Sequence, residues 1–303
     1  MKLLLIDGHY YVYRSFFAIP NLSNSRGERT NAIYGFIKTV RRMLKDLQPE
    51  MGAVFWDEGL PQRRVELQPA YKETRKEMPL PMVPQLDFIR DLTPRMGFKN
   101  ISLPNTEADD LMGCYAIAAA KRGYEVVLAT NDKDLFQLVN PQVKVYTTAK
   151  ADLASPKDTH ALLGEAETIA KWDVPPLLIG DVLAIAGDSV DNIPGAGIGR
   201  KAAAALLREH GGLESLLNNL DKVKSLRTRE KLMAAREQIL QNRKMVALDC
   251  DTELPVPLDD LRIQPDYPAL LEVLEKCEFK SLLQEVREEQ AKAGVATQSE
   301  LLL

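Results

Sequence analysis

Acidic residues stand where the apolar segments of this chain end. Asp7 follows residues 3–6, Asp57 follows residues 53–56, and an Asp-rich stretch follows residues 126–129. Each run is short, apolar and typical of a buried strand. Because the carboxyl ends of parallel strands face one crevice in an open α/β sheet, we expect these side chains to converge although they are distant in sequence.

The whole acidic set contains neither His nor Cys. It comprises Asp7, Asp57, Glu107, Asp109, Asp110, Asp132, Asp134, Asp188 and Asp191. Converging carboxylates repel one another, and divalent cations are the simplest remedy. A ligand set made only of oxygen atoms selects hard ions such as Mg²⁺ or Mn²⁺. The sequence therefore predicts a metal site.

Taken singly, these acids also have structural explanations. Glu107 and Asp109 would begin a helix, where negative charge suits the helix dipole. Asp134 would cap a helix that starts at Leu135, and Asp188 would suit a turn. The metal interpretation rests on the set as a whole.

Composition narrows the class of protein. The chain has 303 residues, and its three cysteines lack CxxC spacing, which argues against structural zinc or a disulfide framework. No stretch reaches the roughly 20 apolar residues of a membrane span. The net charge of −4 does not exclude a nucleic acid partner, because bound metal would offset the acids. We expect a soluble cytoplasmic protein that does not bind a membrane.

Periodicity divides the chain into an α/β part and a helical part. Short apolar runs alternate with helical patterns up to about residue 150, which is typical of a mostly parallel sheet flanked by helices. From about residue 155 onward we expect no further strands. We predict strands at 2–6, 52–56, 98–103, 125–130 and 143–147, and helices that include 31–47, 83–95 and 107–121.

The domain limits follow from this change. We expect an α/β domain over residues 1–165 and a helical domain over 166–285. Residues 286–303 are polar and read as a frayed tail.

A long basic connection lies between Asp57 and Glu107. It carries an Arg pair at 63–64, then Tyr71, Lys72 and Arg75. Basic residues with an interleaved aromatic fit contact with single-stranded nucleic acid. The alternative is a solvated loop with ordinary surface charge, and its place beside the acids favours a functional loop.

A glycine-rich turn, Gly-Ala-Gly-Ile-Gly-Arg-Lys at 195–201, precedes an Ala-rich helix. Such a turn exposes backbone N–H groups to an anion at a helix N-terminus. Most glycine-rich turns only reverse the chain. This one directly follows the acidic segment 187–192, which makes it more specific.

With these motifs in order, the chain resembles the 5′-nuclease (flap endonuclease) family, and within it the 5′→3′ exonuclease domains of bacterial DNA polymerases I. The resemblance runs to about residue 284. It rests on Leu5-Ile6-Asp7-Gly8-His9, Glu107-Ala108-Asp109-Asp110, Thr130-Asn131-Asp132-Lys133-Asp134 and the segment 187–201. It implies a PIN-like/5′-nuclease fold with a helical arch around residues 60–95 and a C-terminal helix-hairpin-helix motif.

The resemblance assigns roles to the acids and to two cations. A first Mg²⁺ or Mn²⁺ region would use the acids from Asp7 to Asp132, and a second would use Asp134, Asp188 and Asp191. Lys72 and Arg75 match catalytic residues that approach the scissile phosphate.

The resemblance also implies residues that bind DNA. Arg14, Arg64 and Tyr71 match positions that hold the strand or its 5′ end. The duplex would be held by the hairpin residues Gly195, Gly197, Gly199, Arg200 and Lys201, with K⁺ bound at hairpin carbonyl oxygens. This hairpin is one residue shorter than the usual form, and Ala202 stands in place of the usual Thr.

The expected function is a monomeric, structure-selective 5′ nuclease that hydrolyses phosphodiesters by two-metal-ion catalysis. Its expected substrates in replication and repair are DNA with a 5′ flap, fork, nick or gap, and RNA primers on DNA. Two alternatives remain open at this point. One is a non-catalytic binder of DNA junctions, and the other is a PIN-like ribonuclease.

Overall fold

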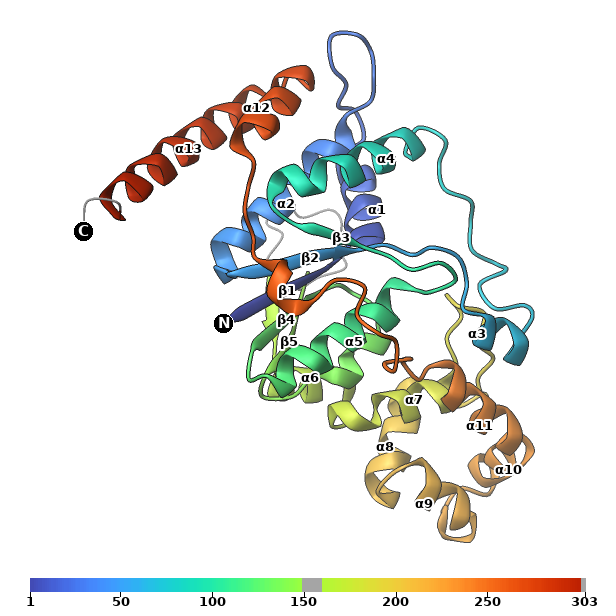
Figure 1. Ribbon diagram of the computed structural model, residues 1–303. Helices are drawn as coiled ribbons and strands as arrows, with labels where there is room; N and C mark the ends of the chain where they lie inside the picture. Colours follow the sequence, from blue (N-terminus) through green and yellow to red (C-terminus); the bar gives the residue numbers. More distant parts are fainter. Residues whose placement is uncertain (149–159, 301–303) are drawn as a thin grey trace. The chain divides into compact units, whose positions relative to one another are not determined.

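The computed structural model describes the backbone of residues 1–148 and 160–300 and the side chains of 1–148 and 160–293 (Figure 1). The chain forms two compact units whose segments interleave in sequence. The first unit consists of Met1–Trp56, Met78–Ile101 and Val256–Leu303. The second consists of Asp57–Glu77 and Ser102–Pro255. Within the described residues, each unit contains three strands and its own helices.

The first unit contains three parallel strands in the order β3-β2-β1. They are β1 (Lys2–Asp7), β2 (Met51–Phe55) and β3 (Lys99–Ile101). Leu5 is in register with Ala53, and Val54 is in register with Asn100. Residues 3–6 are fully buried, as expected for a parallel strand covered on both faces.

The helices of the first unit are amphipathic, and α2 is the clearest case. Ile33, Phe36, Ile37 and Val40 keep helical spacing and are buried. The elements are α1 (Gly8–Ala18), α2 (Asn31–Leu47), α4 (Val83–Leu92), α12 (Tyr267–Lys276) and α13 (Lys280–Glu300), with 3₁₀ turns at Thr93–Met96 and Leu258–Leu261.

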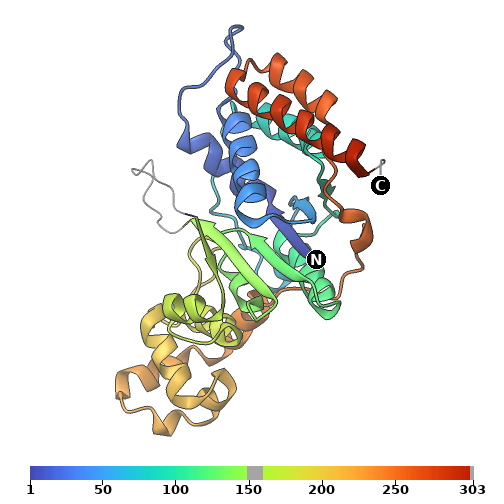
Figure 2. The ribbon, with the colours of Figure 1, turned by 90° about the vertical axis from the view of Figure 1, so that its left-hand side faces the viewer.

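The expectation of a frayed tail after Glu285 was wrong. Helix α13 continues to Glu300 and lies beside α12 (Figure 2). Val286 is buried, and Arg41 of α2 forms ion pairs with Glu285 at 3.1 Å and Glu289 at 2.8 Å. The polar sequence gave no signal for this helix, which is stabilised by packing on α12 as well as by the ion pairs with α2. Residues 301–303 lie outside the described part.

The second unit also contains three strands. β4 (Glu125–Ala129) pairs in parallel with β5 (Val143–Thr148), and β5 pairs in antiparallel fashion with β6 (His160–Leu163). We did not expect β6, and the prediction of no strands after about residue 155 was wrong. This short edge strand carries little sequence signal, and its pairing with β5 and the ring stacking of His160 on Tyr146 depend on tertiary structure.

The second unit is otherwise helical. Helices α7 to α11 gather into one group (Figure 1). The elements are α3 (Gln62–Leu67), α5 (Ala108–Lys121), α6 (Glu165–Trp172), α7 (Ile179–Ala186), α8 (Arg200–His210), α9 (Leu213–Asn218), α10 (Leu226–Ala234) and α11 (Arg236–Met245), with 3₁₀ turns at Asp134–Leu138, Pro176–Leu178 and Leu220–Lys222.

These elements confirm the expected α/β class. Strand pairs within the units are parallel except β5 with β6, helices flank the strands, and the later part of the chain is mainly helical. Residues 60–95 hold two helices, α3 and α4, separated by residues 68–82 without helix, and the two belong to different units. The arch, and the domain boundary near residue 165, stay predictions.

Close packing of α1 on α2 generates the first testable prediction. A Cβ atom at Gly35 would lie 2.7 Å from Cβ of Ser15 and 3.1 Å from its Cα. Alanine normally stabilises a helix relative to glycine by roughly 0.5–1 kcal/mol, but here overpacking outweighs that gain. Gly35→Ala should therefore lower the free energy of unfolding by about 1–3 kcal/mol in urea denaturation.

Gly199→Ala serves as the matched control. Nothing lies within 4 Å of a Cβ at Gly199, and its φ of −70° is ordinary. This variant should unfold at nearly the wild-type urea concentration. Equal stability of Gly35→Ala and wild type would contradict the packing argument.

Candidate active site

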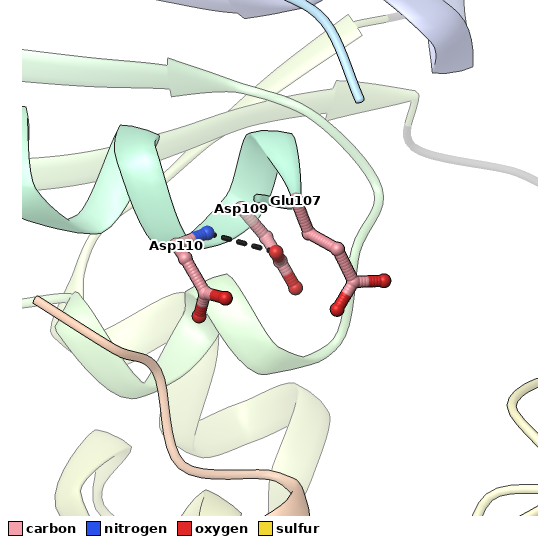
Figure 3. Close-up of side chains that lie close together, drawn as sticks. All are labelled: Glu107, Asp109 and Asp110. Carbon is pink, nitrogen blue, oxygen red and sulfur yellow. Dashed lines mark hydrogen bonds between the residues drawn. The ribbon is translucent and has the colours of Figure 1, made fainter. Parts of the chain in front are cut away.

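Three acids project from the beginning of α5 (Figure 3). Glu107 is the N-cap residue, and Asp109 and Asp110 lie in the first turn. The helix begins here because the Ala108 N–H donates to Oδ1 of Asp57 at 2.8 Å and the Asp110 N–H donates to Oδ1 of Asp109 at 2.8 Å. Glu107 and Asp110 are each only 2% exposed. Local capping thus places three carboxylates side by side, with Glu107 and Asp110 buried and Asp109 partly exposed.

Two further acids come from the turn after β4. The Asp134 N–H donates to Oδ1 of Asp132 at 2.8 Å, and the Asp132 N–H donates to the Thr130 hydroxyl at 3.0 Å. One oxygen each from Asp109, Asp132 and Asp134 can be chosen within 4.8 Å of the others, and the same holds for Glu107, Asp109 and Asp110. The two groups therefore share Asp109.

Burial makes this arrangement costly for charged carboxylates. It raises the pKa of Asp109 and Asp134 well above the ordinary value, and it also raises the pKa of Asp110 and Asp132. Repulsion from neighbouring acids adds to the effect at each of them. Two overlapping groups of oxygen donors with this repulsion fit hard divalent cations, which would offset the charge.

A buried arginine braces the acids. Arg64 is 1% exposed, donates to Oδ1 of Asp110 at 2.8 Å, and forms an ion pair with Glu107. Its Nε donates to the carbonyl of Met245 at 3.1 Å. Burial lowers the pKa of Arg64, but the three acids more than reverse this, so the guanidinium stays charged. Here Arg64 holds the acids in position.

Lys72 and Tyr71 approach the same cluster. Lys72 forms an ion pair with Glu107, and its Nζ lies 5.0 Å from the centre of the Tyr71 ring. The Tyr71 hydroxyl donates to Glu107 at 3.2 Å. Lys72 has a φ of +58°, a left-handed conformation in which its N–H donates to the Asp191 carbonyl at 3.2 Å. The basic connection thus contacts Glu107 through side chains and Asp191 through a backbone hydrogen bond.

Asp188 and Asp191 lie in the turn after α7 and pair with cations. Asp191 accepts from Arg75 at 2.6 Å, and Asp188 pairs with Lys133 at 2.7 Å. Neither belongs to the two groups of oxygen donors, and neither does Asp57. From the same turn, the Asn192 side-chain amide donates a hydrogen bond of 2.8 Å to the Ala70 carbonyl. The structure thus brings this turn against the segment that carries Lys72 and Arg75.

Asp7 and Arg14 lie in the first unit. Asp7 ends β1, and its Oδ1 accepts from the Tyr10 N–H at 2.9 Å, which caps α1. Arg14 lies in α1 and is half-buried. Their roles as metal ligand and DNA contact stay predictions.

The glycine hairpin joins α7 to α8. A Cβ at Gly195 would lie 2.0 Å from the Ala186 carbonyl oxygen, so only glycine fits this approach. Gly199 caps α8, and Arg200, the first residue of α8, lies 4.9 Å from the centre of the Trp172 ring. Lys201 is exposed. The helix start and its two cations together form a surface suited to phosphate.

Sequence reasoning missed three residues that shape the site. Lys133 neutralises Asp188. Lys231 of α10 donates to the carbonyl of Gly197 in the hairpin. Asn242, fully buried in α11, donates to the carbonyls of Ala184 at 2.9 Å and Pro194 at 2.6 Å. Lys133 could have been predicted as a site residue because it lies between Asp132 and Asp134 in the sequence, whereas no sequence feature pointed to Lys231 or Asn242.

An acid-lined site with only oxygen donors, in an α/β protein with a helical hairpin, fits the class of metal-binding proteins that act on nucleic acids. The sequence matches the N-terminal resolvase-like domain of 5′-3′ exonucleases over residues 2–173. It matches their C-terminal SAM fold over residues 174–269. The chain belongs to the 5′-3′ exonuclease family.

Curated relatives agree with this family, and a solved structure shares the fold. The chain is 36% identical to a 5′-3′ exonuclease of Aquifex aeolicus, covering 94% of each protein. It is 39% identical to the thermostable DNA polymerase I of Thermus thermophilus, with 94% of this chain and 33% of the polymerase aligned. The chain thus spans about a third of the length of the polymerases it matches. A complex of bacteriophage T5 flap endonuclease with DNA and metal ions shares the fold, with a TM-score of 0.68, 20% identity, and coverage of 95% of this chain and 100% of that one.

One finding bears on membranes. Within residues 1–148 and 160–300, no helix combines the length and the apolar character needed to cross a bilayer.

The raised pKa values generate a prediction for Asp134. A carboxyl group with a higher pKa in the folded protein binds more protons when folded, so the folded state loses stability as pH rises through that range. In EDTA at neutral pH, Asp134→Asn should therefore have a higher melting temperature than the wild type. Differential scanning calorimetry at several pH values would measure this, and the difference should shrink at acidic pH.

Asp173→Asn is the control for that experiment. The Asp173 side chain is 50% exposed and lies 4.0 Å from Arg208, so its neutralisation should change the melting temperature little. A destabilised Asp134→Asn variant would show that repulsion among the acids does not limit stability.

Proposed function

We propose that the chain is a structure-selective 5′ nuclease that cleaves phosphodiesters of DNA with a 5′ flap, fork, nick or gap, and of RNA primers on DNA, through two bound Mg²⁺ or Mn²⁺ ions. The proposal rests on two sets of three acidic residues that have Asp109 in common. Lys72 forms an ion pair with Glu107 of the first set. Membership of the 5′-3′ exonuclease family supports the same chemistry.

The acids would hold the metal ions. Glu107, Asp109 and Asp110 would bind at one position, and Asp132 and Asp134, with Asp109, at the other. Asp7, Asp57, Asp188 and Asp191 complete the proposed ligand set, directly or through water. When bound, two such ions lower the pKa of an attacking water and stabilise the leaving 3′ oxygen.

The cations of the chain would handle the phosphate. Lys72 and Arg75 now pair with Glu107 and Asp191, and a phosphodiester entering the site would compete for the same ammonium and guanidinium groups. There they would neutralise charge that develops on the phosphoryl oxygens. The products would carry a 5′-phosphate and a 3′-hydroxyl.

Other residues would bind the DNA duplex and the 5′ strand. We propose that the hairpin glycines, Arg200 and Lys201 hold the duplex backbone, and that Arg14 and Tyr71 hold the 5′ strand. Arg64, buried among the acids, would serve the strand by keeping those acids in place. A K⁺ ion at the hairpin carbonyls is the remaining proposal for this surface, where the Lys231 ammonium already donates to Gly197.

Oligomeric state and location belong to the proposal as well. We propose that the protein acts as a monomer in the cytoplasm. The three cysteines, which are free thiols, support a reducing compartment.

A labelled-flap assay tests the function. With Mg²⁺, the protein should cut a 5′-labelled flap near its junction, and EDTA should abolish cleavage because the carboxylates alone cannot activate water. Parallel substrates with DNA and RNA 5′ strands would define the strand preference. Binding without cleavage in Mg²⁺ and in Mn²⁺ would favour the non-catalytic junction binder, and equal cleavage in EDTA would refute the role of metal.

Lys72 and Arg75 provide a sharper test of the chemistry. Lys72→Ala or Arg75→Ala should each slow single-turnover cleavage by about 10²–10³-fold, because one charged donor to the phosphoryl oxygens is lost. Flap affinity should change much less. Lys76→Ala, an exposed cation in the same segment, is the matched control and should cleave at nearly the wild-type rate. Wild-type rates in both test variants would remove these cations from the mechanism.

A further inference from the structure

Residues 246–252, which we term the strap, run from the end of α11 along α5. The Asp249 N–H donates to Oδ1 of Asp110 at 2.8 Å, and Sγ of Cys114 lies 3.4 Å from the Asp249 carbonyl oxygen. A Cβ at Gly113 would lie 2.7 Å from Sγ of Cys250. The strap is thus attached to the same helix that carries the acid cluster, and Gly113 makes room for the Cys250 sulfur.

The strap brings two cysteine thiols together. Cys114 is 4% exposed on α5, and Cys250 in the strap is half-buried. The two thiols are hydrogen-bonded, and this bond lowers the pKa of Cys114 while it raises the pKa of Cys250. The Cys114 thiol also donates to the Asp249 carbonyl at 3.4 Å, so the strap holds both sulfur atoms next to α5. The two cysteines are 136 positions apart in the sequence, so their proximity is a result of the tertiary structure.

The strap also supports Arg64, which braces the acids. The carbonyl of Ala247 accepts from Arg63 at 2.9 Å and from Arg64 at 3.3 Å. Arg64 in turn donates to Asp110 at 2.8 Å. A covalent link between strap and helix would therefore fasten the support of the acid cluster.

We propose that Cys114 and Cys250 form a reversible intramolecular disulfide when the protein meets a hydroperoxide, and that this bond locks the strap onto α5. The pair is a modification site distinct from the nuclease chemistry, and its formation does not depend on substrate cleavage.

The reaction balances with hydrogen peroxide as the oxidant. The Cys114 thiolate attacks one peroxide oxygen, the S–O bond forms, the O–O bond breaks, and the departing hydroxide takes up a proton to become water. The Cys250 sulfur then attacks the Cys114 sulfur, the S–S bond forms and the S–O bond breaks, and the second hydroxide leaves with the proton of Cys250 as water. Two thiols are oxidised and one peroxide is reduced to two waters.

Cys277 offers an internal control. It is buried at the end of α12, its pKa is raised to about 11 by burial, and it belongs to the first unit. The other two cysteines of the chain both lie in the second unit, so Cys277 has no cysteine within its own unit to pair with. Oxidation that merely followed the presence of a thiol would modify Cys277 as readily as the pair.

Peptide mapping tests the proposal directly. The full chain is treated with stoichiometric hydrogen peroxide, free thiols are alkylated, and the digest is analysed by mass spectrometry. We expect one linked species that joins the Cys114 and Cys250 peptides, with two hydrogens fewer than the separate peptides, and an alkylated Cys277. Dithiothreitol should restore both free peptides. Sulfinic or sulfonic acids at these residues, or links only between chains, would overturn the proposal.

Variants and unfolding add an independent readout. Cys277→Ser should still form the link, whereas Cys250→Ser should not. In calorimetry, peroxide should raise the melting temperature of Cys277→Ser by about 5 °C, because the bond closes a long loop, and should leave that of Cys250→Ser unchanged. If Cys250→Ser fails to fold, mapping of the wild type decides alone. An equal shift in both variants would assign the effect to another site.

Discussion

Mutual repulsion among buried carboxylates is the constraint on which the rest of this structure depends. Glu107 and Asp110 are nearly inaccessible, and burial raises the pKa of Asp109, Asp132 and Asp134. Such a group is tolerated only with counter-charges, and the fold supplies four cations, three from the basic connection between Asp57 and Glu107 and one from the turn after β4. They are Arg64, Lys72, Arg75 and Lys133. The negative charge of the site is therefore offset by ion pairs, and bound metal ions and a phosphate would change which groups pair with one another.

Backbone geometry makes this balance possible. The start of α5 and the turn after β4 present acids through local caps, and Asp57 and Arg64 add support from outside these segments. The turn after α7 needs more. Gly187 and Gly195 pack against each other's backbone, Asn242 satisfies two carbonyls from inside, and Asp188 and Ile193 exchange backbone hydrogen bonds. The strap then completes the support by holding Arg64. Repulsion among the acids opposes folding, whereas the contacts around them stabilise the fold and also keep the acids in position.

Much of the fold could be predicted because its signals are local. The strands β1, β2, β4 and β5 and the helices α2 and α5 followed from apolar runs and helical spacing, with ends displaced by a residue or so. The failures are equally instructive. The strand β6 and the helix α13 have weak patterns, and each is stabilised by tertiary contacts, with β5 for the first and with α12 and Arg41 of α2 for the second.

The sequence by itself determined which atoms this protein can offer to chemistry. Nine acids without His or Cys, placed after apolar runs, already imply hard cations, because ligand type is a property of the residues. Only the tertiary structure decided how those atoms are used. It placed Asp109 in both carboxylate groups, buried Arg64 against Asp110, and brought Cys250 beside α5. These are contacts between segments far apart in the chain, and such contacts arise from packing and charge compensation that no local pattern encodes.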